Sequence, residues 1–419
     1  MSHITTRTLD SGLSLVVERM PQLKSAALAW ILPCGCAHDP LDKQGLSAMW
    51  SELLLRGAGS LDSRAHADAL DRLGASRSTN SGAFTFSITS SMIGERLGGV
   101  LPLLVDMVRA PRIAEDAIEP ARDLCVQAIE SLQDDPQERA VLEARHRHFP
   151  DPLGRSGLGT IEGLASLTRA DLHDRWHALA KPKGSILAAA GDVDAAKLAD
   201  VLESLLSGWI GATTEPKPGP TPARGYAHTS EPSNQVQIIV VHDAPPETDA
   251  TGNPNRAALL EKFAIAVLSG GMSSRLFTHV RERKGLCYSV SAGYRGDRDF
   301  GAVTAYVGTT PDKAQDSLDT LLEQLREINT PRGAITPEEF QRASIGMKSG
   351  IVFSGESSAA RASALAIDQR RFARPRSLDE ILAMVNSVTL DEVNAYLTTR
   401  TLGTLTIQTL GPKPLRPPQ

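Results

Sequence analysis

The sequence has no long apolar run and little cysteine. No stretch of its 419 residues holds eighteen consecutive apolar residues, so a membrane-spanning helix is not expected. Four cysteines in a chain of this size do not form a disulfide framework, which favours a reducing cytoplasm, and the first residues have no apolar segment of signal-peptide length. The net charge of −5 gives no indication of a nucleic-acid-binding face. These absences predict a cytoplasmic protein that binds neither membranes nor nucleic acid.

The composition is typical of a globular protein with more than one domain. Apolar residues make up 41% and charged residues 22% of the chain, and its length exceeds what one ordinary core contains. Residues 211–225 are rich in Pro and Gly and have no hydrophobic periodicity, which is typical of an extended linker. We therefore expect one domain over residues 1–210 and a second over residues 226–419.

The ends of the two expected domains are similar. Thr168 and Asp171 form a predicted capping box before one helix, and Thr389 and Glu392 form another 221 residues later (389 − 168 = 221). An apolar strand follows each of these helices near the end of its half. The recurrence of a capped helix and a terminal strand predicts a duplicated domain.

Both halves contain predicted strands and helices. Alternation of apolar and polar residues, as at Phe84, Phe86 and Ile88, predicts strands, whereas a 3.6-residue period predicts helices. Strand pairs followed by helices indicate an α+β fold in each half, a mixed β-sheet packed with α-helices. The predicted strands are 13–18, 25–32, 83–89, 236–242, 287–294 and 300–308. The predicted helices are 45–55, 96–109, 113–132, 256–268, 312–328 and 337–353.

The first of these helices carries the most informative pattern. Its apolar residues form one buried stripe, while Ala48 and Glu52 lie one turn apart on another face. The stretch from Gly45 to Gly57 resembles the active helix of the insulinase and mitochondrial processing peptidase family. That family carries an inverted zinc motif, His-x-x-Glu-His, in which two histidines bind zinc and the glutamate activates a water.

The resemblance places other residues at every position of the zinc site. The two histidines correspond to Ala48 and Glu52, and the glutamate base corresponds to Ser51. The family's third ligand is a glutamate 76 residues further on, which corresponds to Ala128 (52 + 76 = 128). Methyl groups cannot coordinate zinc, and a single carboxylate cannot hold it tightly. We therefore predict that this chain binds no metal and is not a peptidase by itself.

Two other pairs of residues have ligand chemistry. His173 and His177 are four residues apart on a predicted helix, but no third ligand accompanies them. Cys34 and Cys36 could form a metal or redox pair, although two small residues near a strand end are the simpler interpretation. Glu52 is more simply explained as a solvated or ion-paired carboxylate than as a functional acid.

A block in the second half is more specific. It runs from Leu268 to Val290 and predicts a glycine-rich turn, a short helix and a strand; without a Walker lysine or dinucleotide spacing, phosphate binding is not indicated. The block resembles the same family's C-terminal signature, in which an Arg and a Tyr seven residues apart grip substrate carbonyls and help to stabilise the tetrahedral intermediate. Arg281 and Tyr288 match that pair. From the residues alone, an ion-paired Arg281 and a half-buried Tyr288 are the simpler interpretation.

The lost motif and the preserved block together imply a function shared between two chains. Some bacterial members of the family are heterodimers, in which one two-domain subunit binds zinc and the other supplies the Arg and the Tyr, so that the pair closes like a clamp. The resemblance implies that this chain is the non-catalytic half of such a clamp. It would hold no cofactor and would grip a peptide with Arg281 and Tyr288. Zinc would lie in a partner with an intact His-x-x-Glu-His, and maturation of a small ribosomally made peptide is one role that the family offers.

Two other functions stay open. A structural or peptide-binding scaffold, either homodimeric or like the core subunits of respiratory complexes, would have no role in proteolysis. A peptidase with a different metal site would have to use His173 and His177. The preserved block around Arg281 favours the shared active site over the scaffold.

Overall fold

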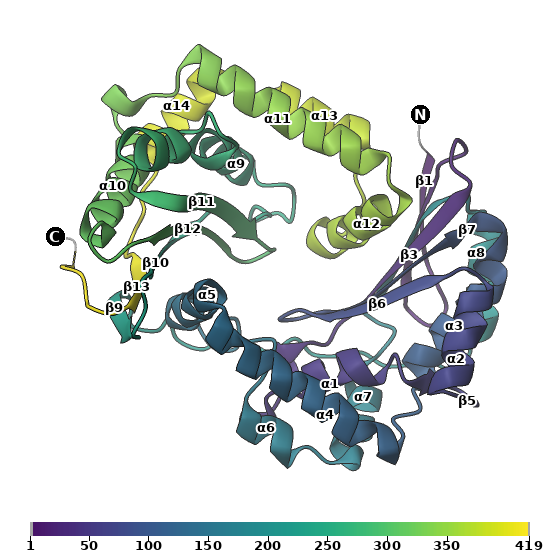
Figure 1. Ribbon diagram of the computed structural model, residues 1–419. Coiled ribbons are helices and arrows are strands. Elements are labelled where there is room, and N and C mark those ends of the chain that lie inside the picture. Colours follow the sequence, from purple (N-terminus) through teal and green to yellow (C-terminus); the bar gives the residue numbers. More distant parts are fainter. Residues whose placement is uncertain (1–2, 418–419) are drawn as a thin grey trace. The chain divides into compact units, whose positions relative to one another are not determined.

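The computed structural model describes residues 3–417 as two compact units (Figure 1). The first unit contains the residues up to Ser131, Asp151–Gly219 and Ser354–Ser377. The second contains Leu132–Pro150, Pro220–Phe353 and the residues from Leu378 onwards. Each unit has its own sheet and its own hydrophobic core. Among the residues described, no helix is both long and apolar enough to cross a bilayer.

The sheet of the first unit has six strands. Strands β2 and β8 are parallel, and every other neighbouring pair is antiparallel. In spatial order the strands are β1 (His3–Thr8), β2 (Ser14–Arg19), β8 (Ile186–Gly191), β3 (Ser25–Leu32), β7 (Phe86–Ile93) and β6 (Ser76–Ser81).

The sheet of the second unit repeats the last five of these strands. Its strands, in spatial order, are β9 (Gly225–Ser230), β13 (Thr406–Gly411), β10 (Val236–Ala244), β12 (Gly301–Thr309) and β11 (Cys287–Gly296). The pair β9–β13 is parallel and the others are antiparallel, as in β2–β8–β3–β7–β6. Because order and direction both recur, the predicted duplication of an α+β domain is confirmed.

Helices cover one face of each sheet. The first unit also contains a two-stranded ribbon, formed by β4 (Gly57–Ala58) and β5 (Leu61–Asp62). The helices of the first unit are α1 (Leu46–Leu53), α2 (Ser63–Arg72), α3 (Leu97–Arg109), α4 (Glu115–Glu130), α6 (Ile161–Ser166), α7 (Arg169–Leu179) and α8 (Ala195–Leu205). Those of the second are α9 (Arg256–Ser269), the short π-helix η5 (Phe277–Arg283), α10 (Ala314–Glu327), α11 (Pro337–Gly355), α13 (Leu378–Asn386) and α14 (Leu390–Thr399).

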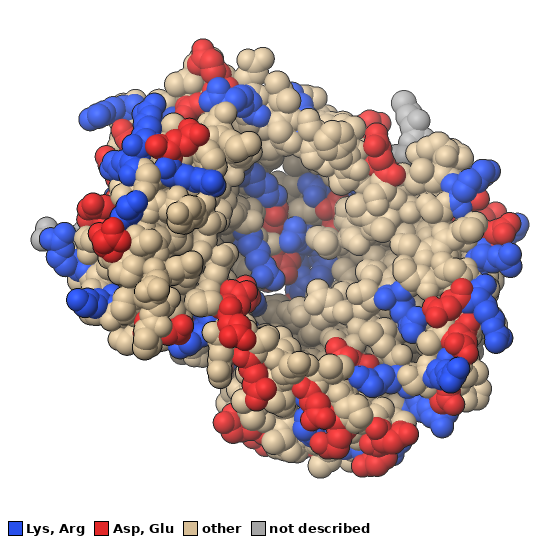
Figure 2. Space-filling view, in the orientation of Figure 1, with Lys and Arg blue, Asp and Glu red and all other residues tan. Residues whose placement is uncertain are grey.

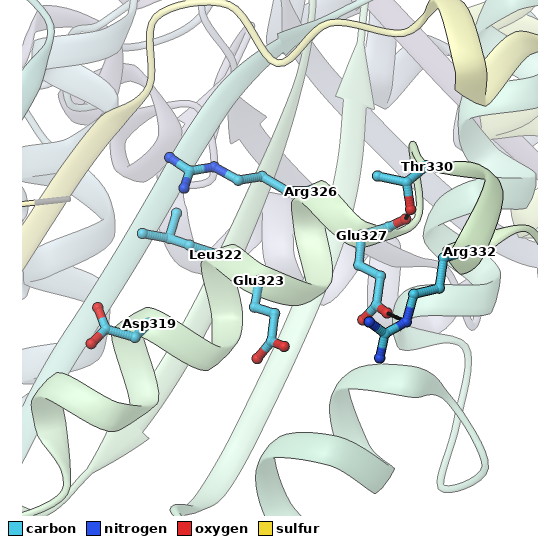
Figure 3. Close-up of a pocket in the computed structure, with 7 residues that line it drawn as sticks. All are labelled: Asp319, Leu322, Glu323, Arg326, Glu327, Thr330 and Arg332. Atoms are coloured by element: carbon cyan, nitrogen blue, oxygen red, sulfur yellow. Dashed lines mark hydrogen bonds and ion pairs between the residues drawn. The ribbon is translucent and has the colours of Figure 1, made fainter. Parts of the chain in front are cut away.

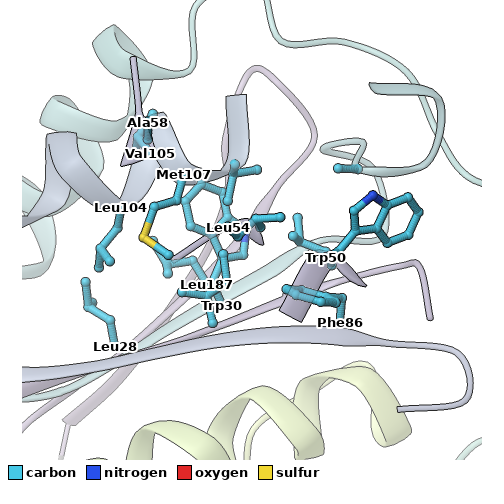
Figure 4. Packing of buried hydrophobic residues seen from close by; sticks show 14 of the residues in the cluster. Leu28, Trp30, Trp50, Leu54, Ala58, Phe86, Leu104, Val105, Met107 and Leu187 are labelled. Atoms are coloured by element: carbon cyan, nitrogen blue, oxygen red, sulfur yellow. The ribbon is translucent and has the colours of Figure 1, made fainter. Parts of the chain in front are cut away.

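Aromatic packing fixes α1 in the core of the first unit. Trp50 of α1 lies edge-to-face against Trp176 of α7, with ring centroids 5.3 Å apart, and Figure 4 shows it beside Phe86 of β7. Both indole N–H groups are satisfied: Trp50 donates to the Leu172 carbonyl at 2.9 Å, and Trp176 donates to the Val108 carbonyl at 2.8 Å. A buried tryptophan that packs and donates a hydrogen bond has little freedom. The face of α1 that carries Ala48 and Glu52 is therefore firmly positioned.

The second face of each sheet is covered by a helix from the other half of the sequence. Helix α12 (Ser358–Phe372) packs on β2, β3 and β8 of the first unit, and α5 (Pro136–His148) packs on β10 and β13 of the second. Their N-caps are Ser357 and Asp135, which are 222 residues apart (357 − 135 = 222) and so match the repeat. The two homologous domains exchange equivalent helices.

This exchange differs from the predicted boundaries. The first sheet lies within residues 1–210, and the second begins at Gly225, the last residue of the predicted linker. Leu132–Pro150 and Ser354–Ser377, however, belong to the opposite units. The linker is extended, and its Gly219 N–H donates to the Asp151 carbonyl at 2.6 Å. Periodicity shows that a helix buries one face, but it does not show which sheet that face covers.

A buried ion pair anchors α12 on its sheet. Arg361 and Glu18 of β2 approach to 2.5 Å, and both residues are 1% exposed. The Arg361 Nε–H donates to the Glu18 carboxylate at 2.7 Å, and a terminal N–H donates to the Arg376 carbonyl at 3.2 Å. Around this pair, Ala362, Leu365 and Ala366 of α12 pack on alanine and valine side chains of the sheet. The guanidinium is thus both paired and further hydrogen-bonded, as a buried charge requires.

A buried histidine anchors α5 on the other sheet. His148 has no exposed surface; its Nδ1 lies 3.0 Å from the Thr406 hydroxyl, and its Nε2 lies 3.2 Å from the Asp243 carboxylate. Burial lowers the pKa of His148 to about 4, Arg224 adds to the decrease, and Asp243 opposes it. His242, which is also buried, contributes a smaller decrease. In the folded protein, the His148 side chain is therefore uncharged at neutral pH.

This histidine should make the fold sensitive to acid. Its folded-state pKa of about 4 lies below the ordinary value of 6.5, so between these values the unfolded chain binds more protons than the folded protein. The stabilisation is present above pH 6.5 and is lost as the pH falls towards 4. We expect His148 alone to lower the free energy of unfolding by about 2 kcal/mol between pH 7.5 and pH 5, measured by urea denaturation. His148→Gln should remove that part of the pH dependence, and an unchanged dependence would show that another group is responsible.

Candidate functional site

The N-terminus of α1 is held by a buried carboxylate. Asp39 accepts hydrogen bonds from the N–H of Gly45 at 3.0 Å and from the hydroxyl of Ser47 at 3.2 Å. Burial raises the pKa of Asp39 to about 6 despite these bonds. Arg155 donates to the Asp39 carbonyl at 2.7 Å, and Gly45 adopts φ 112°, a left-handed conformation suited to glycine. The start of the helix that carries the zinc-motif positions is thus fixed by side-chain contacts.

The four zinc-motif positions lie on two helices that pack together. Ala48, Ser51 and Glu52 are half-buried on α1, which contacts α4, the helix that carries Ala128. The Ser51 hydroxyl donates to the Ser47 carbonyl at 3.3 Å, within its own helix. Glu52 lies 3.9 Å from Arg56. This arrangement gives no set of zinc ligands, because two of the positions end in methyl groups and the only carboxylate faces an arginine.

No set of metal ligands surrounds these positions among the described residues. Burial is the main reason that the pKa of Cys125, on α4, rises to about 11, and the Glu52 carboxylate contributes to the rise. A bound divalent cation needs several deprotonated or carbonyl ligands, and within residues 3–417 no group of three His, Cys, Asp or Glu side chains could hold one. The residues present therefore do not fit the zinc that the motif would bind.

The two alternative pairs do not form a metal site either. The ring centroids of His173 and His177 lie 4.4 Å apart on α7, and the Nδ1 atom of His173 lies within hydrogen-bond distance, 2.9 Å, of the Asp174 carboxylate. Cys34 and Cys36 are buried, and neither forms a disulfide. Burial raises the pKa of Cys34 far above its ordinary value, which disfavours the thiolate that metal binding and redox chemistry need.

Arg281 is exposed on the π-helix of the second unit. Its guanidinium carbon lies 4.8 Å from the centroid of the Phe277 ring, one turn earlier on η5. No carboxylate among the described residues is within ion-pair distance of Arg281. Arg275, by contrast, supports the fold, because it forms an ion pair with the Glu339 carboxylate at 2.7 Å. Of these two arginines, Arg281 is thus the one whose hydrogen-bond donors are unused.

Tyr288 is exposed at a β-bulge. Cys287 pairs with Thr309 and Ser289 pairs with Gly308, so that Tyr288 is the extra residue in β11. A bulge re-aims a side chain and is common beside active sites. Tyr288 is 84% exposed. The interpretation of Arg281 as an ion-paired residue and of Tyr288 as half-buried packing is therefore wrong.

Strand β11 is an edge strand whose outer side is partly covered. The Ala292 N–H donates to the hydroxyl of Ser269, at the end of α9, at 2.8 Å. Backbone groups on a free edge can pair with an extended peptide. The other domain ends on the equivalent strand β6, which alternates exposed and half-buried residues. Both units thus end on a strand that could bind a peptide, and Ser269 limits the length available on β11.

A hollow of about 590 Å³ lies on the surface of α10, and its lining does not indicate a binding site. Figure 3 shows it lined by one helix and the turn that follows, and its charges are mostly matched: Glu327 pairs with Arg332 at 3.7 Å, and Glu323 pairs with Lys284 at 3.6 Å. The outer surface in Figure 2 likewise intersperses acidic and basic side chains, in line with the small net charge. The lining residues are Asp319, Leu322, Glu323, Arg326, Glu327, Thr330 and Arg332.

Three residues of the site were missed in the sequence. Asp39 caps α1 from six residues upstream, which no local capping pattern indicates. Ser269 reaches β11 from a different element. Phe277 could have been found, because a residue four positions before an arginine on a helix lies on the same face.

Sequence profiles decide the family. The profile described as Insulinase (Peptidase family M16) matches residues 14–160, and the profile described as Peptidase M16 inactive domain matches residues 166–347. This chain belongs to peptidase family M16. Among similar proteins, an uncharacterized zinc protease of Mycobacterium bovis is 28% identical, over 98% of this chain and 94% of its own length. Another from Bacillus subtilis is 25% identical, over 92% and 93%.

Solved structures share the M16 fold of this chain. A peptidase M16 inactive domain from Pseudomonas fluorescens superposes with a TM-score of 0.86 at 18% identity, covering 99% of both chains. A protease from Helicobacter pylori superposes with a TM-score of 0.83 at 16% identity, covering 98% of this chain and 100% of its own. At these identities the likeness concerns the fold alone.

Proposed function

We propose that this chain is the non-catalytic subunit of a two-chain zinc peptidase of family M16. It would provide Arg281 and Tyr288 to hold a peptide and to stabilise the transition state at a zinc site on its partner. The zinc partner would be a chain with an intact His-x-x-Glu-His, to be identified by its co-purification with this protein from the native cells. Zinc there would activate the attacking water. This chain would supply hydrogen-bond donors and no metal ligand.

One contrast carries the proposal. The zinc-motif positions hold Ala48, Ser51, Glu52 and Ala128 on well-packed helices, whereas Arg281 and Tyr288 are exposed with free donor groups. A surface Arg that only supports the fold would normally contact a carboxylate, and a surface Tyr would normally pack its ring on its neighbours. Both side chains instead extend from rare backbone features, a π-helix and a bulge. Such features are frequent at functional sites.

The donors suit the chemistry of peptide cleavage. A guanidinium and a phenol both donate strong hydrogen bonds, and a tetrahedral intermediate carries its negative charge on the former carbonyl oxygen. Edge strands β6 and β11 could align an extended peptide by main-chain hydrogen bonds, which tolerate many sequences. The substrate class expected from this geometry is an extended peptide, and the expected location is the cytoplasm.

Zinc titration tests the metal-free half of the proposal. Isothermal titration of the purified chain with zinc should show no stoichiometric binding, because its motif positions lack ligands. The matched control is the variant Ala48→His, Ser51→Glu, Glu52→His and Ala128→Glu, which places the family's ligands on the same packed helices. The variant should bind about one zinc ion per chain. Stoichiometric zinc on the wild-type chain would contradict the proposal.

A scaffold is the second candidate function. The absence of ligands at the motif positions favours it as much as it favours the two-chain peptidase. The exposed, unpaired Arg281 does not favour a purely structural scaffold, which needs no free donor at this position. A purely structural scaffold would be unaffected by Arg281→Ala, and a peptide-binding scaffold would lose peptide affinity without any change in cleavage by the zinc partner.

A further inference from the structure

The Arg281 side chain rests on an aromatic ring. Its guanidinium carbon is 4.8 Å from the centroid of the half-buried Phe277, within the range in which a cation is attracted to a ring face. A planar guanidinium also stacks on such a ring, which restricts a side chain that would otherwise sample many rotamers. With no carboxylate partner among the described residues, Phe277 is the contact that determines where the Arg281 donors lie.

The backbone is also held in place where η5 ends, a few residues after this contact. The Leu286 N–H donates to the Val280 carbonyl at 3.0 Å, which closes the turn after η5. Two groups from neighbouring elements then hold that turn: the Thr309 hydroxyl donates to the Leu286 carbonyl at 2.5 Å, and the Lys313 ammonium donates to the Gly285 carbonyl at 2.9 Å. These bonds fix the chain between Arg281 and Tyr288.

We propose that Phe277 is the positioning residue for Arg281, so that the guanidinium donors of Arg281 are preorganised before a peptide binds. The inference rests on the proposed function, in which Arg281 binds the developing oxyanion. A donor that is already in place does not have to lose rotational freedom during the reaction, and preorganised donors contribute most to transition-state stabilisation. Phe277 itself would not touch the substrate.

A double-mutant cycle tests this role. The four proteins are the wild type, Phe277→Leu, Arg281→Ala and the double variant, each mixed with the zinc partner and assayed by cleavage of fluorescein-labelled casein. Phe277→Leu should lower kcat by about two- to fivefold with KM little changed, the effect expected for an exposed cation–aromatic contact. Phe277→Tyr keeps the ring and should retain wild-type kcat. In the Arg281→Ala background, Phe277→Leu should have no further effect.

Each outcome has a distinct meaning. If Arg281→Ala leaves cleavage unchanged, the proposed function itself fails. If Arg281→Ala lowers cleavage while Phe277→Leu does not, the function stands and the positioning role is wrong. Equal effects of Phe277→Leu in both backgrounds would mean that the ring only supports the fold, and loss of activity in Phe277→Tyr would mean the same. Circular dichroism melting curves of all five proteins identify any variant that is unfolded, and the tyrosine variant tests the role even if the leucine variant fails to fold.

Discussion

Replacing Arg281 by Ala is expected to lower kcat/KM of the two-chain peptidase about a hundredfold, measured with fluorescein-labelled casein and the zinc partner. The guanidinium is exposed, lacks a carboxylate partner among the described residues and extends from a fixed π-helix. Its removal would take away a donor aimed at the oxyanion, and a solvent molecule in a loosely held position cannot replace a preorganised donor. Because Arg281 makes no ion pair that supports the fold and only one exposed contact with an aromatic ring, the melting temperature should change little.

Arg283 provides the matched control for this experiment. It lies on the same helix, carries the same charge and is exposed, but it is not part of the Arg–Tyr pair. Arg283→Ala should leave kcat/KM within about twofold of the wild type, since surface charges away from the site act only weakly. Equal losses for both variants would indicate a general effect of positive charge on peptide attraction, and the specific role of Arg281 would then be wrong.

Breaking the buried pair of Arg361 and Glu18 is expected to lower the free energy of unfolding by about 3–5 kcal/mol. Arg361→Ala would leave the Glu18 carboxylate unpaired at 1% exposure, beneath the helix that the first unit receives from the other half of the sequence. Besides this pair, α12 packs on its sheet through apolar side chains, and the Ser358 hydroxyl lies 3.2 Å from the Ser25 hydroxyl. Urea denaturation followed by circular dichroism measures the loss.

The double variant Glu18→Leu and Arg361→Met separates the charge from the packing. If the cost arises from an unpaired buried carboxylate, replacing both partners by apolar residues should recover most of the lost stability. A double variant as unstable as Arg361→Ala would contradict that explanation. Arg332→Ala, at a strongly exposed arginine whose ion pair spans 3.7 Å, should leave the free energy of unfolding unchanged.

Local elements were predictable because their signals are local. Helix α3 was expected at 96–109 and lies at Leu97–Arg109, and α9 was expected at 256–268 and lies at Arg256–Ser269. The strand expected at 83–89 begins later, at Phe86. The reason is that the carbonyls of Gly82 and Ala83 accept hydrogen bonds from Cys36 and Ala37 instead of joining the sheet.

Features that depend on two distant segments were not predictable. Helix α12 was not predicted from the sequence, and only the folded chain shows that it covers β3 and β8 of the other half. The partner of Arg361 is 343 residues away, and no spacing rule links the two. The bulge that exposes Tyr288 is likewise a matter of register between β11 and β12.

The zinc-motif positions were read from the sequence, but their surroundings were not. The motif gave the positions of Ala48 and Ala128, and the structure adds that their helices pack together. The identity of the residues at these positions could be judged from the sequence because metal ligation depends on side-chain chemistry. Whether Arg281 forms an ion pair, by contrast, depends on which carboxylates the folded chain brings near it, and the sequence alone does not show this.

Cleavage by the wild-type mixture tests the shared active site most directly. Fluorescein-labelled casein is incubated with this chain alone, with the zinc partner alone and with an equimolar mixture, and the rate of peptide release is followed. The two-chain account predicts no cleavage by this chain, little by the partner and at least a hundredfold faster cleavage by the mixture, the effect of adding the missing donors. Equal rates for the partner alone and for the mixture would contradict the account.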